Sequence, residues 1–243
     1  DQWRDISTLD VSDICAAIKN DQIDILVDLA GHSANNSLKV FRIRPAPIQV
    51  AWLGYPGTTG LVEMDYRLTD AIADPDGDPD HFHSEALIRL PEGFLCYAPP
   101  PFPPEIGDPP NKINGYVTFG SFNNPAKINE EVIHLWAEVM KSVSNSRLLL
   151  KYKNWYDQAS LRDSVVERFA ACMIGQDRIK FAVNLDTIKD HLGRYGEVDI
   201  ALDPFPFNGA TTTFEASWMG VPVVTLAGET LSLIHISEPT RPL

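Results

Sequence analysis

The sequence predicts an α/β fold, and three observations lead to that prediction. Short runs of β-prone residues recur along the chain, and segments with the apolar spacing of amphipathic helices separate them. A proline-rich stretch at residues 98–110, APPPFPPEIGDPP, divides the chain into two halves that share this pattern. Repeated strand and helix units predict parallel sheets covered by helices on both faces. We therefore expect two Rossmann-like, doubly wound domains that face each other across a cleft.

The first half contains four candidate strands and is expected to form a domain over residues 1–98. The runs are IDILVDL at 23–29, PIQVAWLG at 47–54, YRLTD at 66–70 and EALIRLP at 85–91. The proline-rich stretch that follows suits neither a helix nor a central strand, because each proline lacks an amide donor and restricts the residue before it. Residues 99–115 are therefore predicted to be a linker.

The second half shows a cleaner alternation and is expected to form a domain over residues 116–230. Its candidate strands are VTFGSF at 117–122, SRLLLKY at 146–152, RIKFA at 178–182, VDIALD at 198–203 and VPVVTL at 221–226. The helix after the first strand has Asn129 as a capping residue, followed by two glutamates that suit its positive end. Its apolar residues fall on one helical face: Val132, Trp136, Val139, Met140 and Val143.

The composition excludes several classes of function. The 243 residues include 20 basic and 33 acidic side chains, a formal charge of −13, which disfavours a general nucleic-acid binder. No apolar run approaches the roughly 18 residues that a membrane-spanning helix needs. The three cysteines lack CxxC spacing, which suits reduced thiols in the cytosol. We expect a cytoplasmic protein without nucleic-acid or membrane partners, in which any phosphate site is local.

The strongest candidate site lies in VDIALDPFPFNGATTTFEASWMGVP, residues 198–222. A buried strand leads into a turn with Asn208 and Gly209, after which Thr211 and Thr212 open a helix. The free amides and positive dipole of a helix start bind anions, and a diphosphate would fit there. The alternative is that the threonines only cap the helix.

A second candidate is FGSFNNPAKIN, residues 119–129, which leaves the first strand of the same domain. Lys127 can reach a phosphate at the carboxyl end of that strand, where ligands of open α/β sheets bind. The alternative is a lysine solvated at the surface. Because both motifs follow strands of one parallel sheet, each makes the other more persuasive.

Three further features are open to two interpretations. The loop AWLGYPGTTG, residues 51–60, has three glycines that allow either close approach of a ligand or an ordinary tight turn. The acidic loop DPDGDPDHFHSE, residues 74–85, contains an Asp-x-Asp pair, but it lacks the spacing of a calcium loop and is expected to be solvated. His32 and His191 each lie beside a predicted strand, where a histidine is either structural or part of a cleft.

In this order the motifs resemble the catalytic region of the O-GlcNAc transferase and SPINDLY family, glycosyltransferases that modify Ser and Thr of intracellular proteins. The resemblance runs from about residue 10 to residue 230. It rests on ILVDLAGHSANN, RPAPIQVAWLGYPGTTGL, DYRLTDAIADP, RLPEGFLCY, VTFGSFNNPAKI and VDIALDPFPFNGATTTFEASWMGVPVVTLAGET. It implies a GT-B fold, a nucleotide-sugar donor held mainly by the second domain, inversion at the anomeric carbon, and neither a metal nor another cofactor.

The resemblance also implies roles for single residues. Lys127 corresponds to the family lysine on the donor diphosphate, and Asn124 to a polar amide near the phosphates. Thr211 and Thr212 match the phosphate-binding helix start, whereas Ala210 stands where animal members have a histidine. The remaining donor-binding residues implied are Asn208 and Gly209 in the turn, Glu215 at the ribose, His191 near the base, and Arg194 beside it.

The sugar and acceptor side would be lined by the first domain. Leu53, Gly54, Tyr55 and Pro56 match the loop at the sugar site, and His32 is the further cleft residue. The family histidine at the sugar–acceptor junction has no counterpart in this sequence, so the general base is unassigned.

The donor sugar is left open by the resemblance. Transfer of N-acetylglucosamine from UDP-GlcNAc to protein Ser or Thr is the family default. Phe207, Ala210 and the string GSFNNPAKI are nearer the plant SPINDLY type, which transfers fucose from GDP-fucose. Because the tetratricopeptide repeats of the family are absent, a non-catalytic remnant that binds nucleotide sugars is a further alternative, as is a transferase acting on small metabolites.

The last stretch, LSLIHISEPTRPL at residues 231–243, is interpreted as foreign to the fold. Its first twelve residues, LSLIHISEPTRP, match the translation of a common transposon-end sequencing adapter. We therefore expect residues 231–243 to be a sequencing artefact, the two-domain fold to be truncated at both ends, and the chain as written to be inactive.

Overall fold

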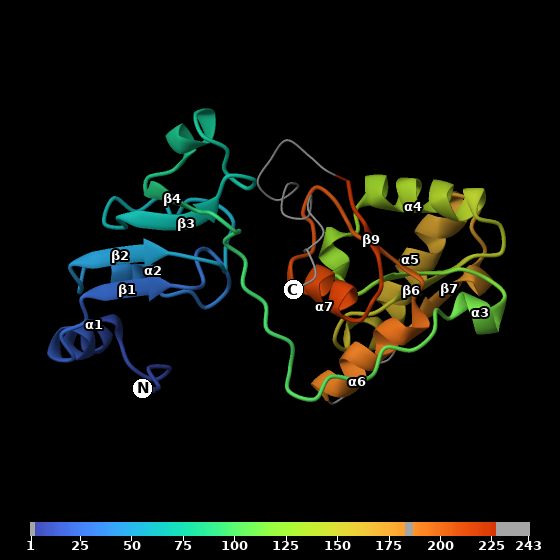
Figure 1. Ribbon diagram of the computed structural model, residues 1–243, viewed down its shortest axis with the longest axis horizontal. Coiled ribbons are helices and arrows are strands. Elements are labelled where there is room, and N and C mark those ends of the chain that lie inside the picture. The colour runs from blue at the N-terminus through green and yellow to red at the C-terminus, as the bar shows by residue number, and fades with distance from the viewer. Residues whose placement is uncertain (1–2, 183–186, 227–243) are drawn as a thin grey trace. The chain divides into compact units, whose positions relative to one another are not determined.

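A computed structural model describes residues 3–182 and 187–226 of the chain (Figure 1). Contacts divide the chain into two compact units, Asp1–Cys96 and Tyr97–Leu243. The domain boundaries expected from the sequence, with a linker at 99–115, stay a prediction. The proposed adapter translation at 231–243 lies outside the described residues.

Unit 1, Asp1–Cys96, is built on a four-stranded parallel sheet whose strands follow chain order. Each strand falls within a run predicted from the sequence, because these runs have the apolar, β-branched character of strands in parallel sheets. The strands are β1 (Ile25–Asp28), β2 (Ile48–Ala51), β3 (Tyr66–Asp70) and β4 (Ala86–Leu90). The helical elements are α1 (Val11–Asn20), α2 (Leu38–Phe41) and the 3-10 turn η1 (Asp78–Phe82).

The core of unit 1 forms where α2 meets the sheet. Phe41 of α2, Ala51 of β2 and Met64 pack into one buried cluster, with Leu26 of β1 against it. Residues of a strand alternate between the two faces of its sheet. The neighbours of Leu26 therefore point the other way, and the side chain of Ile25 is 56% exposed.

Within the described residues, unit 2, Tyr97–Leu243, contains a five-stranded parallel sheet with the order β7-β6-β5-β8-β9. The order reverses beside the central strand β5, which creates a topological switch point between β5 and β8. The strands are β5 (Thr118–Ser121), β6 (Arg147–Leu150), β7 (Ile179–Phe181), β8 (Ile200–Leu202) and β9 (Val223–Val224). The α-helices are α3 (Asn111–Asn114), α4 (Glu130–Ser142), α5 (Ala159–Ala171), α6 (Ile188–Gly193) and α7 (Thr211–Trp218). The 3-10 turns are η2 (Pro125–Lys127), η3 (Trp155–Asp157), η4 (Gln176–Arg178) and η5 (Arg194–Glu197).

Helices cover both faces of this sheet, as the sequence predicts. Leu148 and Leu150 of β6 belong to a core cluster with residues of α4 and α5. Leu149, between them, belongs to a second cluster with residues of α6 and α7. Because consecutive strand residues point to opposite faces, the two clusters lie on opposite sides of the sheet.

Helix α4 also forms as its sequence predicts. The side chain of Asn129 accepts a hydrogen bond from the amide of Val132 at 2.9 Å, which caps the helix start. Trp136 and Met140, on the predicted apolar face, are buried in the core.

Among the described residues, no helix is long and apolar enough to cross a membrane.

Candidate functional site

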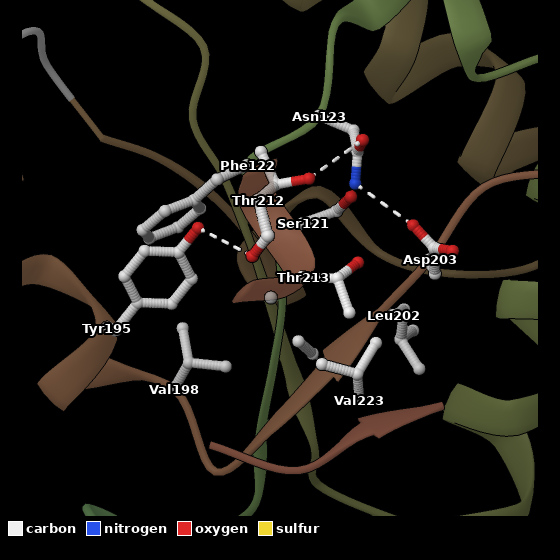
Figure 2. Close-up of a pocket in the computed structure, with 12 residues that line it drawn as sticks. Ser121, Phe122, Asn123, Tyr195, Val198, Leu202, Asp203, Thr212, Thr213 and Val223 are labelled. Carbon is white, nitrogen blue, oxygen red and sulfur yellow. Dashed lines mark hydrogen bonds between the residues drawn. The ribbon is translucent and has the colours of Figure 1, made fainter. Parts of the chain in front are cut away.

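A small cavity in unit 2 lies at the topological switch point, at the carboxyl ends of β5 and β8 (Figure 2). Ser121, Phe122 and Asn123 reach it from β5, whereas Leu202 and Asp203 reach it from β8. The remaining lining residues come from the sheet, from η5 and the residue after it, and from α7: Gly120, Tyr195, Val198, Ala201, Thr212, Thr213 and Val223. The two motifs singled out in the sequence therefore meet at one end of one sheet.

Asp203 organises the turn that follows β8. Its carboxylate accepts hydrogen bonds from the amide of Gly209 at 2.8 Å and from the side chain of Asn208 at 2.9 Å. The hydroxyl of Thr225 and the side chain of Asn123 donate to it as well, at 3.0 and 3.3 Å. Burial raises the pKa of Asp203, although these donors and the charge of Lys127 work against the shift. The turn is thus fixed around a buried carboxyl group.

Lys127 ties the loop after β5 to the same turn. Its Nζ donates to the backbone carbonyl of Asn208 at 2.8 Å and lies 4.5 Å from the centre of the Phe207 ring. Burial lowers the pKa of Lys127, and the negative charge of Asp203 opposes this. Lys127 is therefore a partly desolvated cation at the switch point, and the interpretation of it as a fully solvated lysine is wrong.

The start of α7 is not capped by a threonine. Ala210 is the N-cap residue and makes no side-chain capping bond. Thr212 instead donates to the side-chain oxygen of Asn123 at 3.2 Å, so that Asn123 lies between Thr212 and Asp203 (Figure 2). The simple capping interpretation of these threonines is therefore wrong, and Thr211 stands at the first turn of a helix without a side-chain cap.

Gly209 is required sterically in this arrangement. A Cβ atom on Gly209 would lie 2.3 Å from Oγ1 of Thr212 and 2.9 Å from side-chain oxygens of both Asn123 and Asp203. Two buried oxygen atoms nearby, Oγ of Ser121 and Oδ1 of Asn208, have no hydrogen-bond partner within the part of the chain that the structure describes. Around Gly209 the structure thus combines close packing with buried polar oxygens whose hydrogen-bonding capacity is unused within the described residues.

A second polar cluster in unit 2 contains His191 and Glu215. Nε2 of His191 lies 3.0 Å from Oε2 of Glu215, and Nδ1 of His191 lies 2.7 Å from Nζ of Lys151. The hydroxyl of Tyr195 donates to the same Glu215 oxygen at 3.1 Å. Burial and the nearby carboxylate raise the pKa of Tyr195 well above its ordinary value. Arg194 instead forms an ion pair with Glu197, outside this hydrogen-bonded chain.

The candidate residues of unit 1 also gather at strand ends. The ring of His32, after β1, packs edge-on against Tyr55, after β2, with 5.2 Å between ring centres. Leu53 adopts the left-handed conformation, with φ of 67°. Gly54 approaches the backbone of Leu29 so closely that a Cβ atom would lie 1.8 Å from the carbonyl oxygen. Close backbone packing therefore requires a glycine at position 54. Pro56 lies in the second half of the same loop.

Beneath this loop lies Arg67 of β3, which is 1% exposed. Its Nη1 donates to the carbonyls of Tyr55 and Gly57 at 3.0 and 2.8 Å. Burial lowers the pKa of Arg67, and the charges of Asp74 and Glu85 oppose this effect. The buried guanidinium of Arg67 thus holds the loop through two backbone carbonyls. Arg67 was not among the residues predicted for the site.

The acidic loop after β3 is only partly solvated, contrary to expectation. Asp74 is 3% exposed and is bonded to the hydroxyl of Thr69 and, at 3.3 Å, to His83. Asp80 pairs with Arg89. Asp74 lies shortly after the end of β3, and its buried carboxylate is held there by Thr69 and His83. Within the described ranges, no group of three or more His, Cys, Asp or Glu residues is arranged to hold a metal ion.

Asn124 is placed differently from its neighbour. Its side chain accepts from the amide of Ala126 at 3.0 Å and so caps η2, whereas Asn123 faces Asp203 and Thr212.

Asn123, Asp203 and Lys151 were absent from the predicted site. The available signal was their position, because each follows the carboxyl end of a parallel strand, where ligand-binding residues gather.

Comparisons with known proteins agree with this architecture. The model of the family Glycosyl transferase family 41 matches residues 1–97 and 110–237. The rice protein SPINDLY, named a probable UDP-N-acetylglucosamine–peptide N-acetylglucosaminyltransferase, is 46% identical over 226 residues, covering 93% of this chain and 24% of the relative. The Arabidopsis thaliana protein SEC, with the same enzyme name, is 29% identical over 242 residues, covering 96% of this chain and 24% of the relative.

A solved structure confirms the fold class. A lysine-to-methionine mutant of the Thermobaculum terrenum O-GlcNAc transferase superposes with a TM-score of 0.89 at 35% identity. The match covers 96% of this chain and 44% of that chain. The α/β fold with parallel sheets, expected to be of the GT-B type, is thereby confirmed.

This chain spans about a quarter of the length of the curated relatives that it matches. On the match of the family model over most of its residues, the chain belongs to Glycosyl transferase family 41.

Proposed function

We propose that this chain is part of a protein O-GlcNAc transferase, which moves N-acetylglucosamine from UDP-GlcNAc to Ser or Thr hydroxyls of intracellular proteins with inversion at the anomeric carbon. The observation that carries the proposal is the bond from Lys127 to the carbonyl of Asn208, because Asn208 lies in the turn that leads from β8 into the uncapped start of α7. Helix starts and lysines are the groups that bind phosphates in open α/β sheets. The names of the family relatives support the choice of sugar.

The chemical step uses these groups to stabilise the leaving group. The acceptor oxygen attacks the anomeric carbon and loses its proton, while the bond from that carbon to the diphosphate oxygen breaks. The electron pair of the broken bond stays on the diphosphate, so negative charge builds there. Lys127 and the amides at Thr211 and Thr212 are preorganised for that charge, and they favour the transition state over the bound donor. The proton acceptor is not assigned to a residue of this chain.

The nucleoside half of the donor is assigned to the second polar cluster. We assign the ribose hydroxyls to Glu215 and the base to His191, with Asn124 and Arg194 at the periphery. The bonds that Glu215 accepts from His191 and Tyr195 support this assignment, because they hold the carboxylate in place. The sugar and acceptor side is assigned to His32 and to residues 53–56. No metal or other cofactor is included in the proposal.

A second candidate is protein O-fucosyl transfer from GDP-fucose. The Lys127 ammonium lies 4.5 Å from the centre of the Phe207 ring, so a bulky aromatic side chain lies beside the lysine that the proposal assigns to the diphosphate. The identity to rice SPINDLY, 46%, also exceeds the identity to Arabidopsis SEC, 29%. Under this candidate the diphosphate contacts stay the same and only the sugar and the base differ.

The test is to supply UDP-GlcNAc or GDP-fucose with a Ser/Thr-rich acceptor peptide to the full-length protein of which this chain is proposed to be part, and to follow sugar transfer by mass spectrometry with and without EDTA. Transfer of GlcNAc supports the proposal, and transfer of fucose replaces it with the second candidate. Binding of either donor without transfer identifies a non-catalytic nucleotide-sugar binder. Transfer to a small metabolite but not to the peptide would reject protein acceptors.

Substitution of Lys127 by Met in the same full-length protein tests the leaving-group role. We expect turnover to fall about 100-fold or more, because removal of one preorganised donor to a developing anion costs that much. The free energy of unfolding should change by less than about 1 kcal/mol, since burial of the charge already disfavours the ammonium form. Lys112→Met, at a lysine paired with Asp108 on the surface, is the matched control and should leave both quantities unchanged. Equal turnover of the Lys127 variant and the parent would remove the role.

A further inference from the structure

Lys151 is an unusually buried lysine. It follows β6 directly, next to the central strand β5, and it is 2% exposed. Lysine is almost never fully buried unless its charge is paired. The exposed residue Lys153, two positions on, shows the ordinary behaviour. The burial of Lys151 therefore requires a specific partner.

The partner of Lys151 is a histidine rather than a carboxylate. Its Nζ lies 2.7 Å from Nδ1 of His191, whose other ring nitrogen lies 3.0 Å from Oε2 of Glu215. Lys151 follows β6, whereas His191 belongs to α6 and Glu215 to α7, so the chain of hydrogen bonds joins three segments. The Lys151 ammonium also lies 5.7 Å from the centre of the Phe122 ring.

The chemistry of these groups fixes where the histidine proton lies. An ammonium group has three donors and no acceptor, so Nδ1 of His191 must offer its lone pair to Lys151. The ring proton is then on Nε2, where it can be donated to the Glu215 carboxylate. The opposite tautomer would place the Nε2 lone pair against a carboxylate oxygen, which is repulsive.

We propose that Lys151 is a positioning residue of the nucleotide site, which holds His191 as the neutral Nε2–H tautomer so that the imidazole donates to Glu215. This proposal rests on the proposed function, in which Glu215 receives the ribose and His191 the base. With Lys151 in place, the ring and the carboxylate are oriented before the nucleotide arrives. Binding of the nucleotide then does not have to order these side chains, and its affinity is higher for that reason.

The other charged and titratable groups around His191 agree with this role. Burial lowers the pKa of Lys151, the charge of Glu215 opposes the shift, and the charge of Arg194 adds to it. Tyr195 of η5 donates to Glu215, so that carboxylate oxygen receives two donors. The ring of Tyr97 lies stacked on Phe214, the neighbour of Glu215 in α7, and burial together with the charge of Glu215 raises the pKa of Tyr97. Both tyrosines thus remain neutral, and Tyr195 is the one that donates to the carboxylate.

The first test needs no substitution at Lys151. In the full chain labelled with ¹⁵N-histidine, the His191 signals are identified by their loss in His191→Gln. At pH 7 we expect Nδ1 to show the chemical shift of an unprotonated ring nitrogen and Nε2 that of a protonated one. A protonated Nδ1 in the parent chain would overturn the proposal, whatever the nucleotide affinity.

The second test compares three variants by the same spectra and by calorimetric titration with UDP and with GDP. Lys151→Met should change the Nδ1 chemical shift of His191, because the donor to the lone pair of that nitrogen is gone. It should also weaken binding of the preferred nucleotide by roughly tenfold, the effect of losing a charge-assisted hydrogen bond. Lys151→Arg should restore both readouts, and Lys153→Met should match the parent.

The outcomes separate this proposal from the proposed function. If the parent binds neither UDP nor GDP, the proposed function fails, and the tautomer of His191 still decides the role of Lys151. If a nucleotide binds and Lys151→Met changes neither the spectra nor the affinity, the positioning role is rejected and the proposed function stands. If Lys151→Met does not fold, the spectra of the parent and of Lys151→Arg decide.

Discussion

Single residues set the sharpest constraints on the loop of unit 1 that contains Gly54. A Cβ atom at this position would lie 1.8 Å from the carbonyl oxygen of Leu29 and 2.7 Å from its carbonyl carbon. Both contacts are with backbone, which cannot rotate away as a side chain can. The glycine is therefore required by the approach of the loop to the end of β1, and not by its own backbone angles.

Gly54→Ala is expected to lower the free energy of unfolding by about 1–3 kcal/mol, the range seen when extra atoms are forced into a packed region. The ring contact between His32 and Tyr55 should loosen as well, since the loop must move away from β1. Urea unfolding and the NMR signals of the two rings measure these effects. Gly196→Ala is the control, because a Cβ there meets nothing within 4 Å. A Gly54 variant as stable as the control would contradict the steric argument.

The same residue shows where sequence interpretation stops. The glycines of residues 51–60 could be recognised as permitting close approach, but the approaching atom belongs to Leu29, far away along the chain. Asn123 and Asn124 are a similar case, because two identical neighbours differ only in which of them faces Asp203. Arg67 gave no local signal, since its partners are carbonyls of another loop. Contacts of this kind depend on the pairing of distant strands.

At the scale of elements, the turn between β8 and α7 depends on Asp203. Four donors converge on its carboxylate, from the backbone of Gly209 and from the side chains of Asn208, Thr225 and Asn123. These bonds fix the turn whose carbonyl at Asn208 receives Lys127. Loss of the carboxylate would therefore release both the turn and the lysine.

Asp203→Asn tests this arrangement with almost no change in shape. The amide nitrogen of asparagine would face groups that are themselves donors, so we expect the free energy of unfolding to fall by about 2–3 kcal/mol. Hydrogen exchange of residues 204–213 should accelerate more than that of α4. Asp163→Asn, at an exposed position of α5, serves as the control. Unchanged exchange in the turn would show that Asp203 does not hold it.

The elements themselves could largely be predicted, because their signals are local. The cap at Asn129 and the apolar face of α4 follow from spacing within one segment, and both are present in the structure. The alternation of Leu148, Leu149 and Leu150 between two cores follows from the geometry of a strand. The switch point required more, because the strand order depends on which strands pair. The contact of Lys151 with His191 joins the end of β6 to α6, so neither segment alone carries a signal for it.

On the scale of the whole molecule, the two units shift the pKa values of buried carboxyl groups in opposite directions. In unit 1, burial works to raise the pKa of Asp74, but hydrogen bonds from His83 and Thr69 and nearby positive charges outweigh it, and the pKa lies below 3.8. Glu85 behaves in the same way, with burial outweighed by bonds from Thr59 and Thr58. In unit 2, burial prevails at Asp203, and its pKa lies above 3.8.

The lowered and the raised pKa values change the stability of the fold in opposite directions as the pH falls. A carboxyl group with a lowered pKa in the folded state stabilises the fold above its ordinary pKa, and this contribution is lost as the pH falls through the folded value. Asp74 and Glu85 therefore make unit 1 less stable below about pH 4.5, the ordinary value for glutamate. A carboxyl group with a raised pKa binds its proton more readily when folded. Asp203 therefore stabilises unit 2 as the pH falls through its raised pKa, and the gain is complete below 3.8.

We expect acid to weaken unit 1 before unit 2 within the same chain. Met64 of unit 1 and Met140 of unit 2 are both buried, so ¹³C-methyl methionine signals report each unit separately during urea titrations from pH 7 to pH 3.5. The urea midpoint from Met64 should fall more steeply below about pH 4.5 than the midpoint from Met140. Asp74→Asn should flatten the fall at Met64, because the group that takes up the proton is gone, and it should leave Met140 unaffected. A steeper fall at Met140 than at Met64 would contradict the assignment of the lowered carboxyl groups to unit 1 and the raised one to unit 2.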